Sequence, residues 1–249
     1  MSRPTKWSIV RRISVAAALA LGVAAVGPAR AADEPVKAFN GKDTAGWKTT
    51  DAKAAGNWKV AGDAKMDEKN NKALVAVGEP KDGQAALVLE KAAHGSDLYT
   101  EQAFGDCEVH VEFMVPKGSN SGVYLMGQYE VQVLDSFGKK DADLKPGDVG
   151  GVYNTKAPSK NAAKAPGEWQ SFDIVFKAPR FDKDGKKTAS AVFVNVKLNG
   201  VTIHENVEAP KPTGGQLPGG EKPTGPLMFQ GDHGPVAFRN VTVKPIALR

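Results

Sequence analysis

Cysteine is nearly missing from this chain, in which Cys107 is the only one among 249 residues. A single cysteine excludes a disulfide within the chain, and its distance from the N-terminus excludes a lipid-anchored N-terminal cysteine. Its place in an alternating apolar pattern favours packing in a core over a reactive thiol. The sequence also lacks the Gly-x-Ser-x-Gly elbow of serine hydrolases and a glycine-rich phosphate loop, so serine-hydrolase chemistry and nucleotide use are disfavoured.

Excess charge of one sign is absent from most of the chain. Five of the 33 Lys and Arg residues lie within residues 1–31, which contain no acid, so the other 28 balance the 28 Asp and Glu residues. Nucleic-acid binding normally needs a basic surface that displaces counterions from phosphates. No cluster of basic residues with interleaved aromatics occurs, and a nucleic-acid partner is therefore not expected.

Long apolar runs are also absent. The run at residues 15–26 is shorter than the ~20 residues that a membrane-spanning helix needs. It follows four basic residues and ends shortly before Ala-Arg-Ala at 29–31, which places small residues where a signal peptidase reads the chain. We therefore predict a signal peptide at residues 1–31 and a soluble mature protein, residues 32–249, in the periplasm or secreted, with no membrane partner.

Helical periodicity is almost absent from residues 32–249. Apolar and polar residues alternate instead with a period of two, in short segments separated by turn residues, with 27 Gly and 16 Pro in the chain. Asn199-Gly200 favours a tight hairpin turn. This pattern predicts one all-β domain, an antiparallel β-sandwich or jelly roll, with surface loops at 138–147, 153–167 and 209–224. The predicted strands are 58–60, 73–77, 86–89, 107–115, 122–126, 129–134, 171–176, 191–198, 201–204, 226–230 and 236–243.

The segment SNSGVYLMGQYEVQVLDS, residues 119–136, is the most informative of these strand patterns. Alternation gives it two faces, with Tyr129, Val131 and Val133 on one side and Gln128, Glu130 and Gln132 on the other. The first face is predicted to pack into the core. The second, together with Tyr124 and Asp135, offers uncharged donors and acceptors and two carboxylates, which suit sugar hydroxyls, and it is predicted to line a groove. An ordinary half-exposed strand has the same alternation.

Several further motifs occur in a characteristic order. They are FNGKDTAGWK at 39–48, NSGVYL and YEVQVLDS, GGVYN at 150–154, GEWQSFDIVF at 167–176, the LNG turn, and FQGDHGPVAFRNVTVKP at 229–245. In this order they resemble the 3-keto-disaccharide hydrolase domain family over nearly all of the predicted mature chain. The resemblance implies a concanavalin-like jelly roll, also described as laminin G-like, and an exported protein that acts on glycosides oxidised to a ketone at C3. The chain departs from the family pattern at Gln170, Phe229 and Asp232.

With a ketone at C3, elimination needs a base, an enolate stabiliser and an acid for the leaving oxygen. The ketone acidifies the C2 hydrogen, so a base can form an enolate that expels the group at C1 before water adds. Glu130 is the candidate base, because a partly dry groove would raise its pKa toward neutrality. The alternative for Glu130 is an ion pair with a cross-strand Lys or Arg. His233 is the candidate acid or a metal ligand, although turn histidines often bond only to backbone.

Eight residues are candidate substrate-binding groups. They are Gln128, Gln132, Asp135, Tyr153, Trp169, Gln170, Gln230 and Arg239. Arg239 could steady an enolate or orient Glu130, or it could form a structural ion pair between sheets. The two aromatic residues could stack on sugar faces or pack in the core. Asp135, at the end of its strand, could bind a hydroxyl or cap the following loop.

The sequence leaves a divalent metal cofactor open. Glu108, His110 and Glu112 alternate on one strand face, which brings possible ligands together, but any strand with alternate polar residues does the same. A second possible set is Glu101, Glu130 and His233, which come from separate segments. No other cofactor is predicted.

Two functions from different classes remain. The first is an enzyme that cleaves 3-keto-glycosides, and the second is a non-catalytic carbohydrate-binding β-sandwich module. Direct hydrolysis by two carboxyl groups would need a pair ~5 to 9.5 Å apart. No acidic residue stands two or four positions from Glu130 on its strand face, so this third route is disfavoured. In the two remaining readings the partner is a small carbohydrate.

Overall fold

The computed structural model describes Met1, residues 34–81 and residues 84–248. Apart from Met1, the predicted signal peptide lies outside the described residues. Within the part of the chain that is described, no helix has the length and apolar character needed to cross a bilayer. The two helices that do occur are short 3-10 turns, η1 (Ala52–Asn57) and η2 (Asp141–Asp143).

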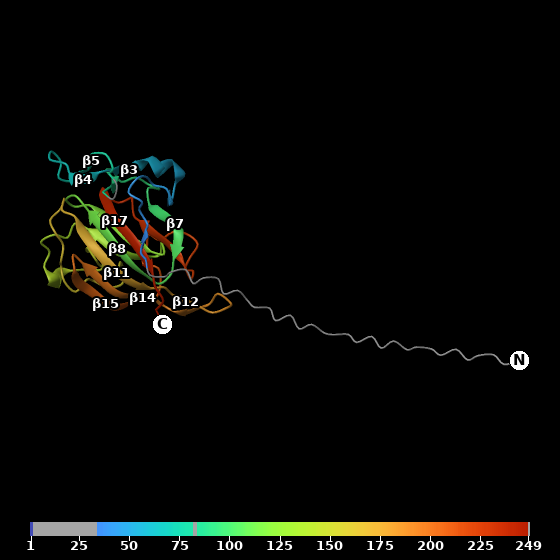
Figure 1. Ribbon diagram of the computed structural model, residues 1–249. Coiled ribbons are helices and arrows are strands. Elements are labelled where there is room, and N and C mark those ends of the chain that lie inside the picture. Colours follow the sequence, from blue (N-terminus) through green and yellow to red (C-terminus); the bar gives the residue numbers. More distant parts are fainter. Residues whose placement is uncertain (2–33, 82–83, 249) are drawn as a thin grey trace. The chain divides into compact units, whose positions relative to one another are not determined.

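Two antiparallel sheets form the framework of residues 34–248 (Figure 1). The large sheet has the order β15-β14-β11-β8-β17-β6-β3, with β1 paired to β17, and the small sheet has the order β10-β9-β16-β7-β2. The large-sheet strands are β15 (Val201–Ala209), β14 (Ala191–Leu198), β11 (Gln170–Lys177), β8 (Cys107–Met114), β17 (Val236–Pro245), β6 (Ala86–Leu89), β3 (Trp58–Ala61) and β1 (Val36–Lys37). The small-sheet strands are β10 (Tyr129–Leu134), β9 (Asn120–Leu125), β16 (Gly225–Phe229), β7 (Leu98–Phe104) and β2 (Trp47–Thr49).

The core lies between these two sheets and contains apolar side chains from both. The ring of Phe229 on β16 stacks on that of Phe238 on β17, with centroids 3.9 Å apart. Val131 on β10 and Val111 on β8 are both completely buried in the same cluster. Because each strand directs alternate side chains into this core, the side chains between them point to the outer face of each sheet. The predicted antiparallel β-sandwich is thus confirmed.

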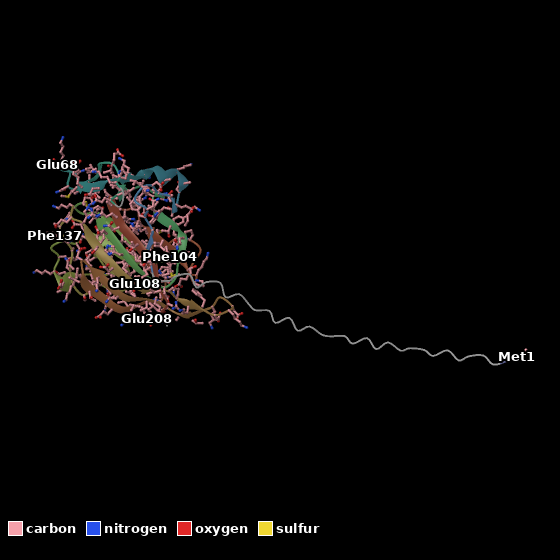
Figure 2. The ribbon with its side chains drawn as sticks, viewed as in Figure 1. Met1, Glu68, Phe104, Glu108, Phe137 and Glu208 are labelled. Carbon is pink, nitrogen blue, oxygen red and sulfur yellow. The ribbon has the colours of Figure 1, made fainter. Side chains whose placement is uncertain are left out.

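Two hairpins lie outside the main sheets. One pairs β4 (Asp63–Met66) with β5 (Leu74–Val77), and the other pairs β12 (Arg180–Phe181) with β13 (Lys187–Ala189). The first covers part of the outer face of the large sheet, where Leu74 packs in a second apolar cluster with Val88 and Met114. Glu68, in the turn of this hairpin, and Glu208 on β15 lie at opposite ends of the described domain (Figure 2).

Local predictions from strand chemistry hold at several points. Asn199 and Gly200 both have positive φ, 51° and 80°, as a tight hairpin turn between β14 and β15 requires. Tyr129, Val131 and Val133 are fully buried in the core, as their alternation predicts. Cys107 also lies in the core, where burial raises the pKa of its thiol to about 12, so it remains a protonated packing residue.

Candidate functional site

Glu130 lies on the outer face of the small sheet, beneath covering loops. It stands opposite Tyr124 in the ladder between β10 and β9, and the Tyr124 hydroxyl donates a hydrogen bond to Glu130 Oε2 at 2.8 Å. Glu130 is only 2% exposed. Its carboxyl occupies the space above Gly122, where any Cβ would collide with it. The carboxyl therefore depends on a glycine in the neighbouring strand for its position.

Two loops satisfy the free backbone groups of β10, which is the edge strand of the small sheet. Gly150 N donates to Gln132 O at 2.8 Å, and Tyr153 N donates to Glu130 O at 3.2 Å. Glu130 N donates to the hydroxyl of Thr213 at 2.9 Å. Both loops are thereby fixed against the strand that carries the candidate base.

Residues 210–224 form the second of these loops and pass over the same sheet face. Leu217 O accepts a hydrogen bond from Gln128 Nε2 at 2.9 Å, which ties the loop to the start of β10. Gly215 has a φ of +64° and approaches the Tyr124 hydroxyl so closely that a Cβ would lie 2.6 Å from it. The backbone at Gly215 therefore covers the Tyr124 hydroxyl, and a residue with a side chain could not take this position.

The surroundings of Glu130 raise its pKa to about 8. Burial is the largest cause, because it removes water from the carboxylate, and the negative charges of Asp232 and Asp97 add to it. The hydrogen bond from Tyr124 acts in the opposite direction. Near neutral pH the carboxyl can therefore exchange a proton, as a general base or acid must.

A turn next to this carboxyl carries the predicted acid, His233. Gly231 N donates to Asp97 Oδ1 at 2.8 Å, and Ala93 N donates to Gly231 O at 3.2 Å, so the turn is fixed at its start. His233 Nδ1 contacts the carboxylate of Asp232, and both side chains are accessible to solvent. Burial raises the pKa of Asp97, an effect that Asp232 strengthens and His233 opposes. Three carboxyl groups and an imidazole thus act on one another at this end of the small sheet.

Two buried amide oxygens near Glu130 have no hydrogen-bond partner. Among the described residues, Asn120 Oδ1 and Gln128 Oε1 are the two buried side-chain atoms in this condition. By strand alternation Asn120 shares the outer face of β9 with Tyr124, and it stands opposite Leu134 on β10. Along the strands, Gln128 is therefore ~7 Å to one side of Glu130 and Asn120 ~13 Å to the other. Unsatisfied buried acceptors are rare and fit a ligand that donates hydroxyl groups.

Four predicted substrate-binding residues lie at this face. They are Gln128, Gln132, Gln230 and Tyr153, of which the three glutamines are buried and the tyrosine is half-buried. Gln230 Nε2 lies 3.5 Å from the Tyr124 hydroxyl. The ring of Tyr153 lies beside the 210–224 loop, 3.6 Å from where a Cβ on Gly214 would be. Gln128 also lines a cavity of about 190 Å³ with Leu217 at the edge of this face.

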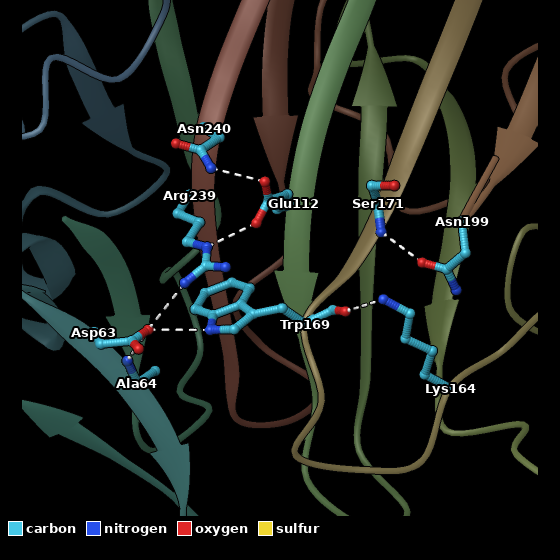
Figure 3. Close-up of polar contacts among 9 residues, drawn as sticks. All are labelled: Asp63, Ala64, Glu112, Lys164, Trp169, Ser171, Asn199, Arg239 and Asn240. Atoms are coloured by element: carbon cyan, nitrogen blue, oxygen red, sulfur yellow. Dashed lines mark hydrogen bonds and ion pairs between the residues drawn. The ribbon is translucent and has the colours of Figure 1, made fainter. Parts of the chain in front are cut away.

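Arg239 and Trp169 do not lie with Glu130. Both belong to a group of polar contacts (Figure 3) that lies beside the second apolar cluster on the outer face of the large sheet. Arg239 Nε donates to Glu112 Oε2 at 2.7 Å and its Nη1 to Asp63 Oδ1 at 3.3 Å, while Trp169 Nε1 donates to the same Asp63 oxygen at 3.0 Å. The Arg239 guanidinium lies 4.1 Å from the centre of the Trp169 ring. The expectation that Arg239 could orient Glu130 is therefore not met, because Arg239 instead joins β17 to Glu112 on β8, to Asp63 on the β4–β5 hairpin and to Trp169 just before β11.

Gln170 and Asp135 are also held by backbone partners away from the Glu130 carboxyl. Gln170 Oε1 accepts from Lys164 N at 2.9 Å. Asp135 accepts from Gly118 N at 2.9 Å and from Phe137 N at 3.3 Å, which is the loop-capping alternative for this residue. Glu130 itself has no Lys or Arg partner among the described residues, so the predicted cross-strand ion pair is not what the structure contains.

The two predicted metal-ligand sets are not assembled. His110 Nδ1 contacts Asp173 Oδ1 at 2.7 Å, while Glu112 is engaged by Arg239. Glu101 pairs with Lys48 at 3.0 Å. Over residues 34–81 and 84–248, no three His, Cys, Asp or Glu side chains are grouped so as to hold a metal ion.

Sequence reasoning did not identify Asp97, Asn120 or Thr213 as parts of this site. A signal existed for Asn120, because its alternation with Tyr124 places both on the outer face of β9. The sequence around Asp97 does not indicate a role in the site. Asp97 lies near the 231–234 turn only because β7 pairs with β16. Thr213 lies in a Pro- and Gly-rich loop whose path the sequence does not specify.

Comparison with solved structures gives relatives with this fold. A candidate glycosyl hydrolase from Parabacteroides distasonis ATCC 8503 is 26% identical, with a TM-score of 0.59 over 86% of this chain and 84% of that one. A second candidate glycosyl hydrolase from the same organism is 19% identical, with a TM-score of 0.56 over 87% of this chain and 95% of that one, and it shows likeness of fold alone. A comparison with curated proteins found no match.

The family model agrees with the order of motifs along the chain. The model described as a 3-keto-alpha-glucoside-1,2-lyase-like domain matches residues 34–244. This span includes both sheets, the 210–224 loop and the turn that carries His233. The chain therefore belongs to the family of 3-keto-alpha-glucoside-1,2-lyase-like domains, the 3-keto-disaccharide hydrolase family.

Proposed function

We propose that the mature chain is a periplasmic or secreted hydrolase that cleaves 3-keto-glycosides, with Glu130 as its general base. The observation that carries the proposal is the arrangement on the small sheet, where a buried carboxyl with a pKa of about 8 lies between two unsatisfied amide oxygens. Family membership and the likeness to a candidate glycosyl hydrolase support a carbohydrate substrate.

The proposed reaction begins with proton abstraction at C2. Glu130 takes the proton, and the electron pair of the C2–H bond moves into the C3 carbonyl to form an enolate. The enolate returns to a ketone as the C1–oxygen bond breaks, which leaves a C1=C2 double bond, and an acid protonates the departing oxygen. Water then adds its oxygen to C1 while C2 regains a proton, so the net change is hydrolysis.

The charges around Glu130 favour an uncharged substrate. The charged groups that act on its pKa are Asp97 and Asp232, and neither Lys nor Arg is among them. Elimination from a uronate would place a further carboxylate in this negative environment, where repulsion opposes binding. A C3 ketone acidifies the C2 hydrogen without adding a charge, so it fits the site better.

Two donors support the later steps of this reaction. Burial raises the pKa of the Tyr124 phenol far above its usual value, so Tyr124 remains a hydroxyl donor at any physiological pH. When Glu130 accepts the C2 proton, this donor becomes available to an enolate oxygen. His233 is the proposed acid for the leaving oxygen, because its turn is accessible to solvent and fixed next to Asp97.

Hydroxyl groups of the sugar are proposed to satisfy the amides at this face. Gln128 Oε1 and Asn120 Oδ1 are free to accept, and Gln132 and Gln230 are further amides on the same side. Tyr153 is proposed to line the approach, since its ring lies beside the 210–224 loop.

The experiment is turnover of a 3-keto-glucoside by the protein and by Glu130→Gln. The variant keeps the shape of the side chain but cannot act as a base, so the rate should fall by a factor of ~10² to 10⁴. Calorimetric titration of the same ligand should show little change in affinity. Glu112→Gln, on the opposite sheet, is the matched control and should keep its turnover.

The outcomes of this experiment distinguish the enzyme from the non-catalytic binding module. Undiminished turnover by Glu130→Gln rules out Glu130 as the base. If the unmodified protein consumes no 3-keto-glycoside at any metal concentration but still binds glycans, the protein is the non-catalytic carbohydrate-binding module instead.

Export is the remaining part of the proposal. It is supported by the confinement of excess positive charge and of the longest apolar run to residues 1–31. N-terminal sequencing of material from the periplasm or medium should return a start near Ala32, and a sequence that begins at Met1 would refute processing.

A further inference from the structure

A cavity of about 540 Å³ lies beside β15 and takes no part in the proposed reaction. β15 is the edge strand of the large sheet, and the cavity forms where residues 156–159 approach its free side. Ser159 N donates to Ile203 O at 3.1 Å and holds this loop to the strand. This hydrogen bond fixes the loop that lines one side of the cavity to the strand that lines the other.

His204 lines this cavity, and its Nδ1 is a hydrogen-bond acceptor without a partner among the described residues. The side chain is 4% exposed, and its Nε2 lies 2.8 Å from Gly150 O. A carbonyl oxygen can only accept, so Nε2 carries the proton of this contact. Burial lowers the pKa of His204, which keeps the ring neutral and leaves Nδ1 as a lone-pair acceptor. Among the described residues Nδ1 has no partner.

The remaining polar groups around the cavity carry both signs of charge. Lys156 lies close enough to His204 to contribute to its lowered pKa, and its ammonium has no partner among the described residues. Asp141 and Glu205 contribute carboxylates, and Thr202 a hydroxyl. One cation and two anions give a slightly negative site, which disfavours an anionic ligand.

Apolar side chains complete the lining. Leu144, Pro158, Ile203 and Val207 alternate with the polar groups along the walls. A site that combines a few convergent polar groups with apolar walls suits a compact molecule that has hydroxyl groups and C–H faces. A metal ion is a poorer fit, because the described residues contain no group of three ligands for one.

We propose that this cavity is a second carbohydrate site, in which an uncharged mono- or oligosaccharide donates a hydroxyl to His204 Nδ1 and accepts from Lys156. The site is distinct from the face that carries Glu130, and the inference does not rest on the proposed reaction. One backbone segment lies between the two sites, because Gly150 accepts from His204 and donates to Gln132 of β10. A sugar chain held in the cavity would therefore remain next to the strand that carries the candidate base.

The test is an amide NMR titration of the mature protein with glucose, cellobiose and maltotriose. Binding in this cavity should shift the amides of Ser159, Ile203 and His204. His204→Leu removes the acceptor but keeps a side chain of similar bulk, so affinity should fall about 5- to 10-fold. His204→Gln can donate to Gly150 O through Nε2 and accept through Oε1, so it should retain more of the affinity. Glu208→Gln, an exposed change on the same strand, is the control and should keep the affinity of the parent.

Lys156→Ala provides a second variant in an exposed position, where folding is not at risk, and it should also weaken binding several-fold. The proposal is overturned if none of the three sugars shifts these amides, or if His204→Leu and Lys156→Ala both bind as tightly as the parent protein. Shifts confined to Tyr124 and Gln230 would place the sugar at the other face and would also overturn it. Turnover of a 3-keto-glucoside by His204→Gln should equal that of the parent, so a failure of the proposed reaction appears in a separate measurement.

Discussion

The outer faces of the two sheets carry carboxyl groups in opposite settings. On the large sheet, Glu112 receives hydrogen bonds from Arg239 at 2.7 Å and from Asn240 at 2.7 Å. Asp63, on the hairpin that covers this face, receives them from Arg239 and Trp169. On the small sheet, Glu130 is more deeply buried and has only a phenol as its donor.

The pKa values follow this difference. Burial alone would raise the pKa of Glu112, but the hydrogen bonds from Asn240 and Arg239 outweigh it and the pKa is lowered. Burial dominates at Glu130, and its pKa is raised to about 8. Removing the cation from a paired buried carboxylate lowers the stability of the fold. A buried carboxylate without a cation destabilises the fold when ionised, and its raised pKa allows it to exchange a proton near neutral pH. This difference supports the small-sheet face as the proposed reactive site.

The largest expected effect is on the pH dependence of stability. Because the folded pKa of Glu130 lies above its unfolded value, its favourable contribution is complete below pH 4.5 and is lost as the pH rises through about 8. Glu130→Gln cannot ionise, so it should be more stable than the parent at pH 9, by on the order of a few kcal/mol, and nearly equal to it at pH 4. Urea unfolding at both values measures this difference.

Glu112→Gln should show the reverse dependence. Its folded pKa is lowered, so the stability that Glu112 contributes is present above its unfolded pKa and is lost as the pH falls through the folded one. The variant should therefore be less stable than the parent at pH 7 and approach it in acid. Equal pH dependence of the two variants would remove the distinction between the two faces.

The second prediction concerns the glycine below the Glu130 carboxyl. Gly122→Ala places a Cβ where the carboxyl now lies and forces it aside, so turnover of a 3-keto-glucoside should fall by about 10²-fold. Gly105→Ala is the control, because a Cβ there meets its nearest atoms at an ordinary 3.5 Å. Unchanged turnover of Gly122→Ala in a folded protein would mean that the position of the carboxyl is not critical.

The third prediction concerns the paired face. Arg239→Gln leaves the carboxylates of Glu112 and Asp63 without their cation and removes the contact with Trp169. We expect a loss of ~1 to 3 kcal/mol in unfolding free energy. Turnover at temperatures where the variant is folded should be unchanged, and a loss of turnover would return Arg239 to the list of substrate-binding residues.

The smallest expected effect is at an unsatisfied amide. Gln128→Met retains the length of the side chain but removes the free acceptor and the hydrogen bond to Leu217 O, so KM should rise by about 10-fold while kcat stays nearly constant. Gln102→Met, at an exposed position of β7, is the control. A change in kcat alone would mean that the amide acts in the chemical step and not in substrate binding.

Strand alternation was sufficient to predict the sandwich and one face of the site. The period of two placed Tyr129 and Val131 in the core and left Glu130 on the other side, and all three are found so. It did not predict β7, in which Thr100, Glu101 and Gln102 interrupt the apolar pattern. That strand gains its place from pairing with β16 and β2, which the local sequence does not encode.

The polar contacts of the site could be predicted less well than the fold. Alternation assigns a side chain to one face of a strand, but it does not say which sheet the strand joins. Alternation therefore allows Arg239 to lie beside Glu130, but β17 and β10 belong to different sheets and the two side chains lie on opposite sides of the core. The burial of Glu130 likewise depends on the path of the 210–224 loop, which folds over the sheet through contacts at Thr213 and Leu217.

The most direct test of the account is the pH dependence of kcat/KM for the unmodified protein on a 3-keto-glucoside. Glu130 acts as a base only when ionised, so the rate should rise with pH through a midpoint near 8, as the raised pKa of this carboxyl requires. Glu112→Gln should give the same profile as the parent. A profile that is flat above pH 5, or a midpoint near the ordinary glutamate value, would contradict the assignment of the buried Glu130 carboxyl as the base.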